Sequence, residues 1–115
     1  MERQIRDRIG AGPVPLWHAT SSGGTTAGLA LGCARSGSNL RVVGSSVGDD
    51  ADAMTRKVRA LLEGTDAPTA TYEIVDQYIG RGYGMTTTAE LSVQVEATRL
   101  TGLIWDPTYT GKALY

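Results

Sequence analysis

The sequence has no phenylalanine, one cysteine and only two lysines among its 115 residues. Because Cys33 stands alone, the chain can form neither an internal disulfide nor a zinc site built from cysteines. Any mechanism that needs a reactive lysine must use Lys57 or Lys112. Charge is also close to balanced, with 11 basic against 12 acidic side chains and a net charge of −1. This balance gives no electrostatic basis for binding nucleic acid or an anionic membrane.

Long apolar runs are missing as well. No segment approaches the roughly 20 apolar residues that a membrane-spanning helix requires. The first ten residues, MERQIRDRIG, are charged and lack the apolar stretch of a secretion signal. We therefore expect a cytoplasmic protein that makes no membrane contact. The length suits one domain, residues 1–115, which could bury about two thirds of its unfolded surface.

Strand-like and helix-like segments alternate along this chain. Apolar runs predict four short strands, at residues 14–19, 40–47, 71–75 and 103–105. Small or periodic apolar residues predict helices around Ile5 and Ile9 and over residues 27–34. A further helix is predicted after Asp49 or Asp50, with Met54, Val58, Leu61 and Leu62 on one face. Another is predicted after Thr87, with Leu91 and Val95 on one face. Such alternation is typical of an α/β fold in three layers, with helices flanking a short, mostly parallel sheet. So few strands would leave apolar faces and edges exposed, so we also expect a homo-oligomer.

The segment between the first predicted strand and helix is a candidate anion site. Its sequence, TSSGGTTAG at residues 20–28, places glycines where a backbone must approach an oxyanion closely. Free N–H groups at the helix start would point to the anion, and the hydroxyls add donors. The segment has neither the spacing of the dinucleotide fingerprint nor the lysine of a Walker A motif. The alternative is a tight strand-to-helix turn whose small residues serve packing alone.

A family resemblance extends this interpretation. Residues 18–32, HATSSGGTTAGLALG, resemble the phosphate loop of the D-cysteine desulfhydrase and 1-aminocyclopropane-1-carboxylate deaminase family. These are pyridoxal-phosphate enzymes of fold-type II, the tryptophan-synthase β-like fold. Three later segments agree in order: LRVVG at 40–44, DQYIGRGYG at 76–84, and DPTYTGK at 106–112, which resembles the family's DPVYTGK. The resemblance covers nearly all of the chain from His18 onward and implies a truncated large domain of such an enzyme.

The resemblance also implies roles for individual residues. The cofactor phosphate would be held by Ser22, Gly23, Gly24, Thr25 and Thr26. Tyr83 and Tyr109 would face the cofactor and substrate, and Thr110 resembles the desulfhydrases, since the deaminases tend to carry Glu there. For each tyrosine the alternative is a half-buried aromatic whose hydroxyl is paired.

Both lysines fall outside the position that the family uses for its Schiff base. By the resemblance, that lysine lies well upstream of the phosphate loop, in a segment that we expect this chain to lack. Lys57 is predicted at the margin of a helix stripe with its amine in water, and Lys112 belongs to the DPTYTGK motif. Because a Schiff base needs an amine held over the cofactor, we predict no covalent attachment and no self-sufficient pyridoxal-phosphate lyase.

The function that we predict from these residues is a lysine-independent hydrolysis of activated esters or phosphoesters. The anion loop would stabilise developing negative charge on a phosphate-containing or other anionic small molecule. Candidate oxyanion contacts are Ser21, Ser22, Thr25, Tyr83 and Tyr109, with His18 or Asp106 as base. A divalent metal is a weaker option that no recognised spacing supports, with possible ligands in His18, Cys33, Asp49, Asp50, Asp52 and Asp76.

Two other functions stay open at this point. The chain could be a non-catalytic module that binds phosphate, pyridoxal phosphate or a partner chain. It could also be a fragment of a desulfhydrase- or deaminase-type lyase that works only beside its missing segments. Structural roles also remain for His18 as a packed strand-end residue, for Cys33 as helix core, and for the acidic residues at 49–52 as charges at a helix start.

Overall fold

A computed structural model describes residues 3, 4, 7 and 12–115 of the chain. The helix predicted around Ile5 and Ile9 rests on residues outside this described part. The elements, in chain order, are β1 (Pro15–Thr20), α2 (Gly24–Ser36), β2 (Arg41–Ser46), α3 (Ala51–Leu62), β3 (Glu73–Val75), α4 (Thr88–Thr101) and α5 (Thr110–Leu114). None of the helices in the described part combines the length and apolar character needed to cross a membrane.

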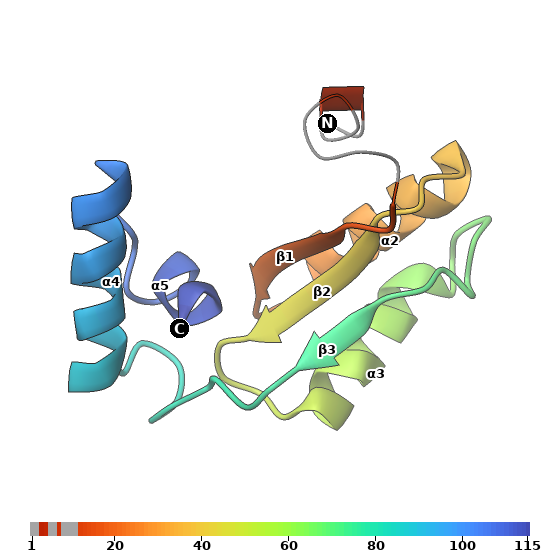
Figure 1. The fold of residues 1–115 in the computed structure, drawn as a ribbon. Helices are drawn as coiled ribbons and strands as arrows, with labels where there is room; N and C mark the ends of the chain where they lie inside the picture. The colour runs from red at the N-terminus through yellow and green to blue at the C-terminus, as the bar shows by residue number, and fades with distance from the viewer. Residues whose placement is uncertain (1–2, 5–6, 8–11) are drawn as a thin grey trace.

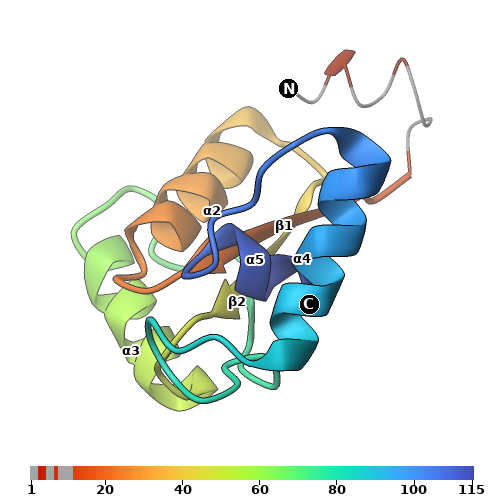
Figure 2. The same cartoon turned by 90° about the vertical axis from the view of Figure 1, so that its left-hand side faces the viewer.

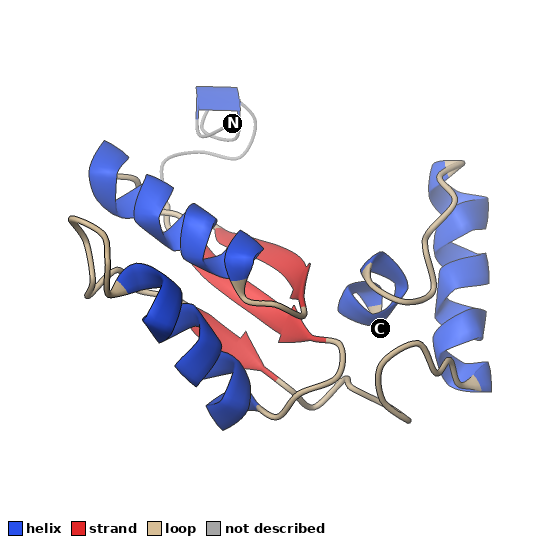
Figure 3. Cartoon of the chain, turned by 180° about the vertical axis from the view of Figure 1, so that it is seen from behind, coloured by secondary structure: helices blue, strands red, loops and turns tan. Residues whose placement is uncertain are grey.

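The three strands form one parallel sheet in the order β1-β2-β3. Strand β2 lies in the middle, and every one of its residues after Arg41 is buried. Helices α2 and α3 connect successive strands and pack side by side on one face of the sheet (Figure 3). Because the strands are parallel, all three carboxyl ends meet at one edge. The α/β fold with a short parallel sheet and flanking helices is therefore confirmed.

Helices α4 and α5 form a second group, beside the carboxyl ends of β1 and β2 (Figure 1). The short α5 lies between α4 and the strands, as the perpendicular view also shows (Figure 2). This arrangement brings residues 88–115 to the same end of the sheet as the loop that follows β1.

Local sequence signals account for several helix ends. The Asp50 carboxylate caps α3 by accepting the Ala53 N–H at 2.7 Å. Thr87 and Glu90 form the predicted capping box at the start of α4. Gly37 and Gly102 close α2 and α4 in the left-handed conformation that favours glycine.

The predicted faces of α3 and α4 need correction. Met54, Val58 and Leu62 are buried as expected on α3, but Leu61 is 50% exposed. On α4 the predicted inner residues Leu91 and Val95 are exposed, whereas Glu90 and Gln94 are buried. The reason is that α4 turns its polar side toward α5, where the Glu90 carboxylate meets a buried lysine and Gln94 packs against Gly111.

The fourth predicted strand, at residues 103–105, is wrong. The structure gives this segment no strand assignment, and the sheet of the described residues has three strands. Leu103 and Ile104 are largely exposed, at 58% and 92%. An apolar run becomes a strand only when a neighbouring backbone supplies its hydrogen bonds, and no such ladder forms beside this segment in the described part of the chain.

Candidate functional site

The candidate site lies at the carboxyl end of the sheet, where three loops of the chain come together. The loop after β1 contacts α3, because the Lys57 ammonium lies 3.5 Å from the Ser21 carbonyl oxygen. The loop after β2 contacts the tyrosine-bearing loop, since a Cβ added to Gly48 would lie 3.1 Å from the Cβ of Tyr83. Ligands of open α/β sheets bind in the crevice outside these strand ends. The fold thus places the predicted anion loop where such a site is expected.

Gly23 gives the loop its shape. Its φ of 83° lies in the left-handed region, and it directly precedes the first turn of α2. A Cβ at this position would lie 3.1 Å from Val58 Cγ2 and 3.3 Å from the Val58 nitrogen, so the loop backbone packs directly on α3. At Gly24 an added Cβ would meet only the Ser22 hydroxyl, at 3.6 Å. The loop is therefore closed on its α3 side and open at Gly24.

The start of α2 offers unpaired donors to an anion. The first backbone hydrogen bond of the helix runs from the Ala27 N–H to the Gly23 carbonyl at 2.9 Å. Within the described part of the chain, no acceptor meets the N–H groups of Thr25 and Thr26. The first turn carries no acidic residue, and Ser22 and Thr25 are exposed. Unpaired N–H groups and the helix dipole together favour an anion at such an end, and this 13-residue helix is long enough to have one.

The side chain of Thr26, in contrast, is structural. It is fully buried, and its hydroxyl donates to the Thr20 hydroxyl at 2.9 Å. His18 lies beside it, with Nε2 3.4 Å from the Thr26 oxygen and Nδ1 2.9 Å from the Ala19 carbonyl oxygen. Both ring nitrogens of His18 are thus engaged within β1 and α2. This arrangement corresponds to the packed, hydrogen-bonded alternative for His18.

Tyr83 and Tyr109 come together although 26 residues separate them. Their hydroxyl oxygens are 2.6 Å apart, and the rings meet edge to face with centroids 5.9 Å apart. Both rings are exposed, at 57% and 40%. The hydrogen bond with Tyr83 is the main cause that raises the pKa of Tyr109 above its ordinary value of 10.0. Tyr109 therefore keeps its proton at neutral pH, and the pair offers a hydroxyl group to a neighbouring molecule.

Asp106, a predicted base, is committed to holding the turn that carries Tyr109. Its carboxylate accepts the N–H groups of Thr108, Tyr109 and Thr110 at 3.1, 2.8 and 3.1 Å. Burial alone would raise the pKa of Asp106, but these three N–H bonds outweigh it and lower the pKa below its ordinary value. A carboxylate stabilised in this way is a weak base, so its role here is to orient the turn.

Each lysine has an acidic partner. The Lys57 ammonium donates to the Asp49 carboxylate at 2.7 Å across the edge of the anion loop, and about half of its side chain is exposed. The Lys112 ammonium is fully buried, 3.0 Å from Glu90 and 2.6 Å from the Ile79 carbonyl oxygen. Sequence reasoning missed the Glu90–Lys112 pair. The capping-box glutamate was visible, but its lysine lies 22 residues away.

The predicted metal ligands do not converge. Among the described residues, no group of three His, Cys, Asp or Glu side chains could hold a metal ion. Asp50 caps α3, and Asp76 accepts the Ala51 N–H at 2.8 Å, so these two acidic residues stabilise a helix start. Cys33 is partly buried on α2, away from the anion loop.

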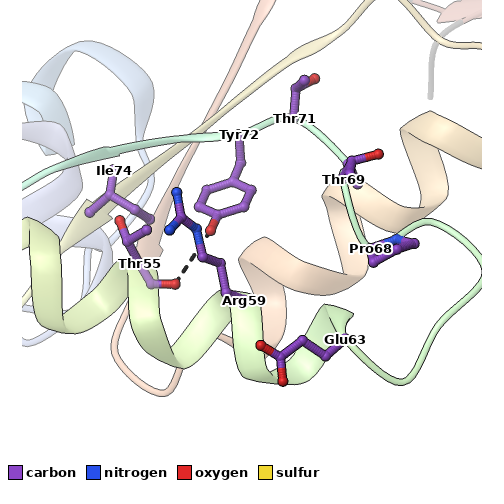
Figure 4. A pocket seen from close by; sticks show the side chains of 9 residues that line it. Thr55, Arg59, Glu63, Pro68, Thr69, Thr71, Tyr72 and Ile74 are labelled. Atoms are coloured by element: carbon purple, nitrogen blue, oxygen red, sulfur yellow. Dashed lines mark hydrogen bonds between the residues drawn. The ribbon is translucent and has the colours of Figure 1, made fainter.

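A cavity of about 520 Å³ lies elsewhere, between α3 and the segment that leads into β3 (Figure 4). Its lining includes Arg59, Glu63 and Tyr72, and the Tyr72 hydroxyl donates to the Thr55 carbonyl oxygen at 3.4 Å. None of the predicted site residues lines this cavity. The carboxyl end of the sheet, where the predicted residues gather, is therefore the candidate site.

Comparisons with known proteins show which family the chain belongs to. A family model described as pyridoxal-phosphate dependent enzyme matches residues 3–115. The chain is 39% identical over 99 residues to a bifunctional mitochondrial D-cysteine desulfhydrase/1-aminocyclopropane-1-carboxylate deaminase of Arabidopsis thaliana, covering 84% of this chain and 25% of that protein. It is 33% identical over 117 residues to a D-cysteine desulfhydrase of Salmonella typhi, covering 97% of this chain and 35% of that protein.

A solved structure agrees with these relatives. The crystal structure of a homologue of ACC deaminase superposes with a TM-score of 0.82 at 30% sequence identity. The superposition covers 99% of this chain and 36% of the other chain. The chain thus spans between a quarter and about a third of the length of the relatives it matches.

Proposed function

This chain belongs to the pyridoxal-phosphate dependent enzymes, and we propose that it forms the phosphate-binding part of a lyase site of the D-cysteine desulfhydrase and ACC deaminase type. The observation that carries the proposal is the meeting of two features at one end of the sheet. These are the open anion loop at the start of α2 and the hydroxyl pair of Tyr83 and Tyr109.

The loop residues fit a phosphate group. In this proposal the hydroxyls of Ser22 and Thr25 and the unpaired N–H groups of Thr25 and Thr26 bind the phosphate oxygens. Gly23 and Gly24 let the backbone approach, because a Cβ added at Gly24 would contact only the Ser22 hydroxyl, at 3.6 Å. Bound pyridoxal phosphate supplies an electron sink for the substrate carbon next to the amine.

The tyrosine pair would serve proton transfer and orientation. With the hydroxyls 2.6 Å apart, one donates to the other, and the second proton remains available to a substrate group. The hydrogen bond with Tyr83 raises the pKa of Tyr109 above its ordinary value, so Tyr109 stays protonated at neutral pH. The pair can therefore hold or donate a proton, in agreement with the role that the family resemblance implies for it.

The amine of such a site would come from outside this chain. Lys57 is paired with Asp49, and Lys112 is buried against Glu90, so both described lysines already have a carboxylate partner. We propose that this chain holds the cofactor through its phosphate alone, without a covalent bond. Lyase turnover then requires a segment beyond residues 1–115 that supplies the lysine, and a homo-oligomer is a further part of this proposal.

Lysine-independent hydrolysis of activated esters or phosphoesters is the second candidate. The unpaired N–H groups of the loop favour it, because they could stabilise an oxyanion without a lysine. Its predicted bases give it less support. His18 is hydrogen-bonded within β1 and α2, and three N–H groups hold the Asp106 carboxylate.

Comparing pyridoxal 5′-phosphate with pyridoxal tests the proposal. Both ligands are titrated into the purified chain by calorimetry, and the phosphate form should bind at least tenfold more tightly. Ser22→Ala should then weaken the phosphate form by roughly 10- to 100-fold, because a hydrogen bond to a charged group contributes about 1.5–3 kcal/mol. Ser92→Ala is the matched control, since that hydroxyl bonds only within α4.

Equal affinity for the two ligands would rule out that the loop binds the phosphate group. Borohydride reduction of the complex, followed by mass measurement, checks the non-covalent part, and a stable adduct on either lysine would contradict it. Turnover of activated esters or phosphotriesters that is lost in the Ser22 variant would instead favour the hydrolase candidate.

A further inference from the structure

The Glu90–Lys112 pair is unusual because both charged side chains are completely buried. Each has 0% exposure, and the ammonium nitrogen lies 3.0 Å from the carboxylate. Burying two charges costs desolvation energy that their attraction only roughly offsets, so such a pair is weak evidence for stability. One known use of buried ionic groups is to hold elements in a single arrangement. The role of this pair therefore depends on which elements it joins.

The pair joins α4, α5 and the glycine-rich loop at residues 79–84. The Lys112 ammonium, on α5, donates to the Ile79 carbonyl at 2.6 Å as well as to Glu90. The second Glu90 oxygen accepts the Thr87 N–H at 2.5 Å, which fixes the carboxylate on α4. Gly80 has a φ of 64°, and a Cβ there would lie 2.5 Å from Glu90 Oε1. The ion pair therefore contacts the loop backbone directly and leaves no room for a side chain at Gly80.

Each tyrosine of the candidate site lies three residues from a position that the ion pair holds. Tyr83 follows Gly80 by three positions, and Tyr109 precedes Lys112 by three positions at the start of α5. Their rings are exposed, so burial in the core does not hold them in place. We infer that the buried Glu90–Lys112 pair is a positioning device that holds the 79–84 loop against α5, so that the Tyr83 and Tyr109 hydroxyls meet.

This inference rests on the proposed function only in the chemical role that it gives to the tyrosine pair. The positioning itself is measured without any ligand, so its failure and the failure of the phosphate proposal are separate results. Glu90 and Lys112 act here through the backbone that they hold, and neither is placed in contact with substrate.

The double variant Glu90→Gln/Lys112→Met tests the inference. It keeps the side-chain volumes and leaves no buried charge unpaired, but it removes the ammonium that holds the loop. The readout is the phenolate absorption of the tyrosines as pH is raised, with Tyr83→Phe added in each background. In the native background, Tyr83→Phe should lower the pKa of Tyr109 toward its ordinary value, because the hydrogen bond with Tyr83 raises it. In the double variant Tyr109 should already titrate near that value, and Tyr83→Phe should change nothing further.

An unchanged coupling between the tyrosines in a folded double variant would overturn the inference. Two controls exclude general effects. Arg35→Met removes the exposed ion pair with Asp66, and Leu62→Ala destabilises the α3 core. Both should leave the tyrosine coupling intact, and loss of coupling in Leu62→Ala would also overturn the inference, because stability alone would then explain it.

If the double variant fails to fold, the native chain supplies the test by hydrogen exchange. The Gly82 and Met85 amides form the hydrogen bonds of the loop, and the Lys112 and Ala113 amides form those of α5. A loop held by the ion pair should open together with α5, so these amides should show protection within a factor of about ten of one another. Loop amides that exchange more than a hundredfold faster than those of α5 would refute the inference that the ion pair holds the loop against α5.

Discussion

Replacing Gly23 by alanine should damage both the fold and the candidate anion site, and the structure allows the two effects to be separated. The substitution forces a left-handed backbone on a residue with a side chain, since φ is 83°. This costs about 1–2 kcal/mol. The new Cβ would also lie 3.1 Å from Val58 Cγ2 and 3.3 Å from the Val58 nitrogen. Val58 is β-branched and fully buried, so it cannot rotate away, and such overpacking adds about 1–3 kcal/mol.

Gly37→Ala is the matched control for this substitution. Gly37 ends the same helix with a φ of 63°, but no atom lies within 4 Å of an added Cβ. It should therefore show the backbone cost of about 1–2 kcal/mol without the crowding. Urea unfolding, followed by circular dichroism, measures both values, and we expect Gly23→Ala to lose about 2–5 kcal/mol.

The ligand measurement completes the comparison. Pyridoxal 5′-phosphate should bind Gly23→Ala at least tenfold more weakly than the native chain, because the loop must move away from α3 to admit the methyl group. Gly37→Ala should bind it unchanged, since its strain lies at the far end of α2. Equal stability losses in the two variants would refute the packing argument, and unchanged affinity in a folded Gly23→Ala would refute the placement of the phosphate.

Three further outcomes follow from the structure. Leu62→Ala should lower the free energy of unfolding by about 2–5 kcal/mol in urea, because it leaves a cavity in the α3 core. Tyr83→Phe should lower the pKa of Tyr109 in a spectrophotometric titration, and an unchanged value would contradict their hydrogen bond. Acid should destabilise the chain through Glu90. Burial raises the pKa of Glu90, but the Thr87 N–H and the Lys112 ammonium lower it below its ordinary 4.5. The contribution is therefore complete above about pH 4.5 and is lost as the pH falls through the lower folded value, and stability that stays constant over this range would contradict it.

Several features were readable from the sequence because neighbouring residues decide them. The cap at Asp50, the capping box of Thr87 and Glu90, and the glycine at the end of α2 depend on hydrogen bonds within a few residues. The anion loop is equally local, since it needs only a strand, two glycines and a following helix. The family resemblance rested on the same short segments, and the matches to desulfhydrases and deaminases confirm it.

Other features were not readable because distant residues decide them. Apolar spacing on α4 predicted Leu91 and Val95 as the inner face, yet the helix presents Glu90 to a lysine 22 residues away. Periodicity assumes that the buried face is apolar, and a buried ion pair breaks that assumption. The apolar run at 103–105 failed as a strand for a related reason, since strand formation requires a neighbouring strand that composition cannot supply.

By itself, the sequence determined the parallel α/β order, the position of the candidate anion loop and the presence of only two lysines. Each of these depends on the order and type of residues along the chain. Only the tertiary structure decided that Tyr83 and Tyr109 share a hydrogen bond and that Glu90 and Lys112 are buried together. Those contacts join segments more than 20 residues apart, and their geometry comes from how α5 packs between α4 and the ends of the strands.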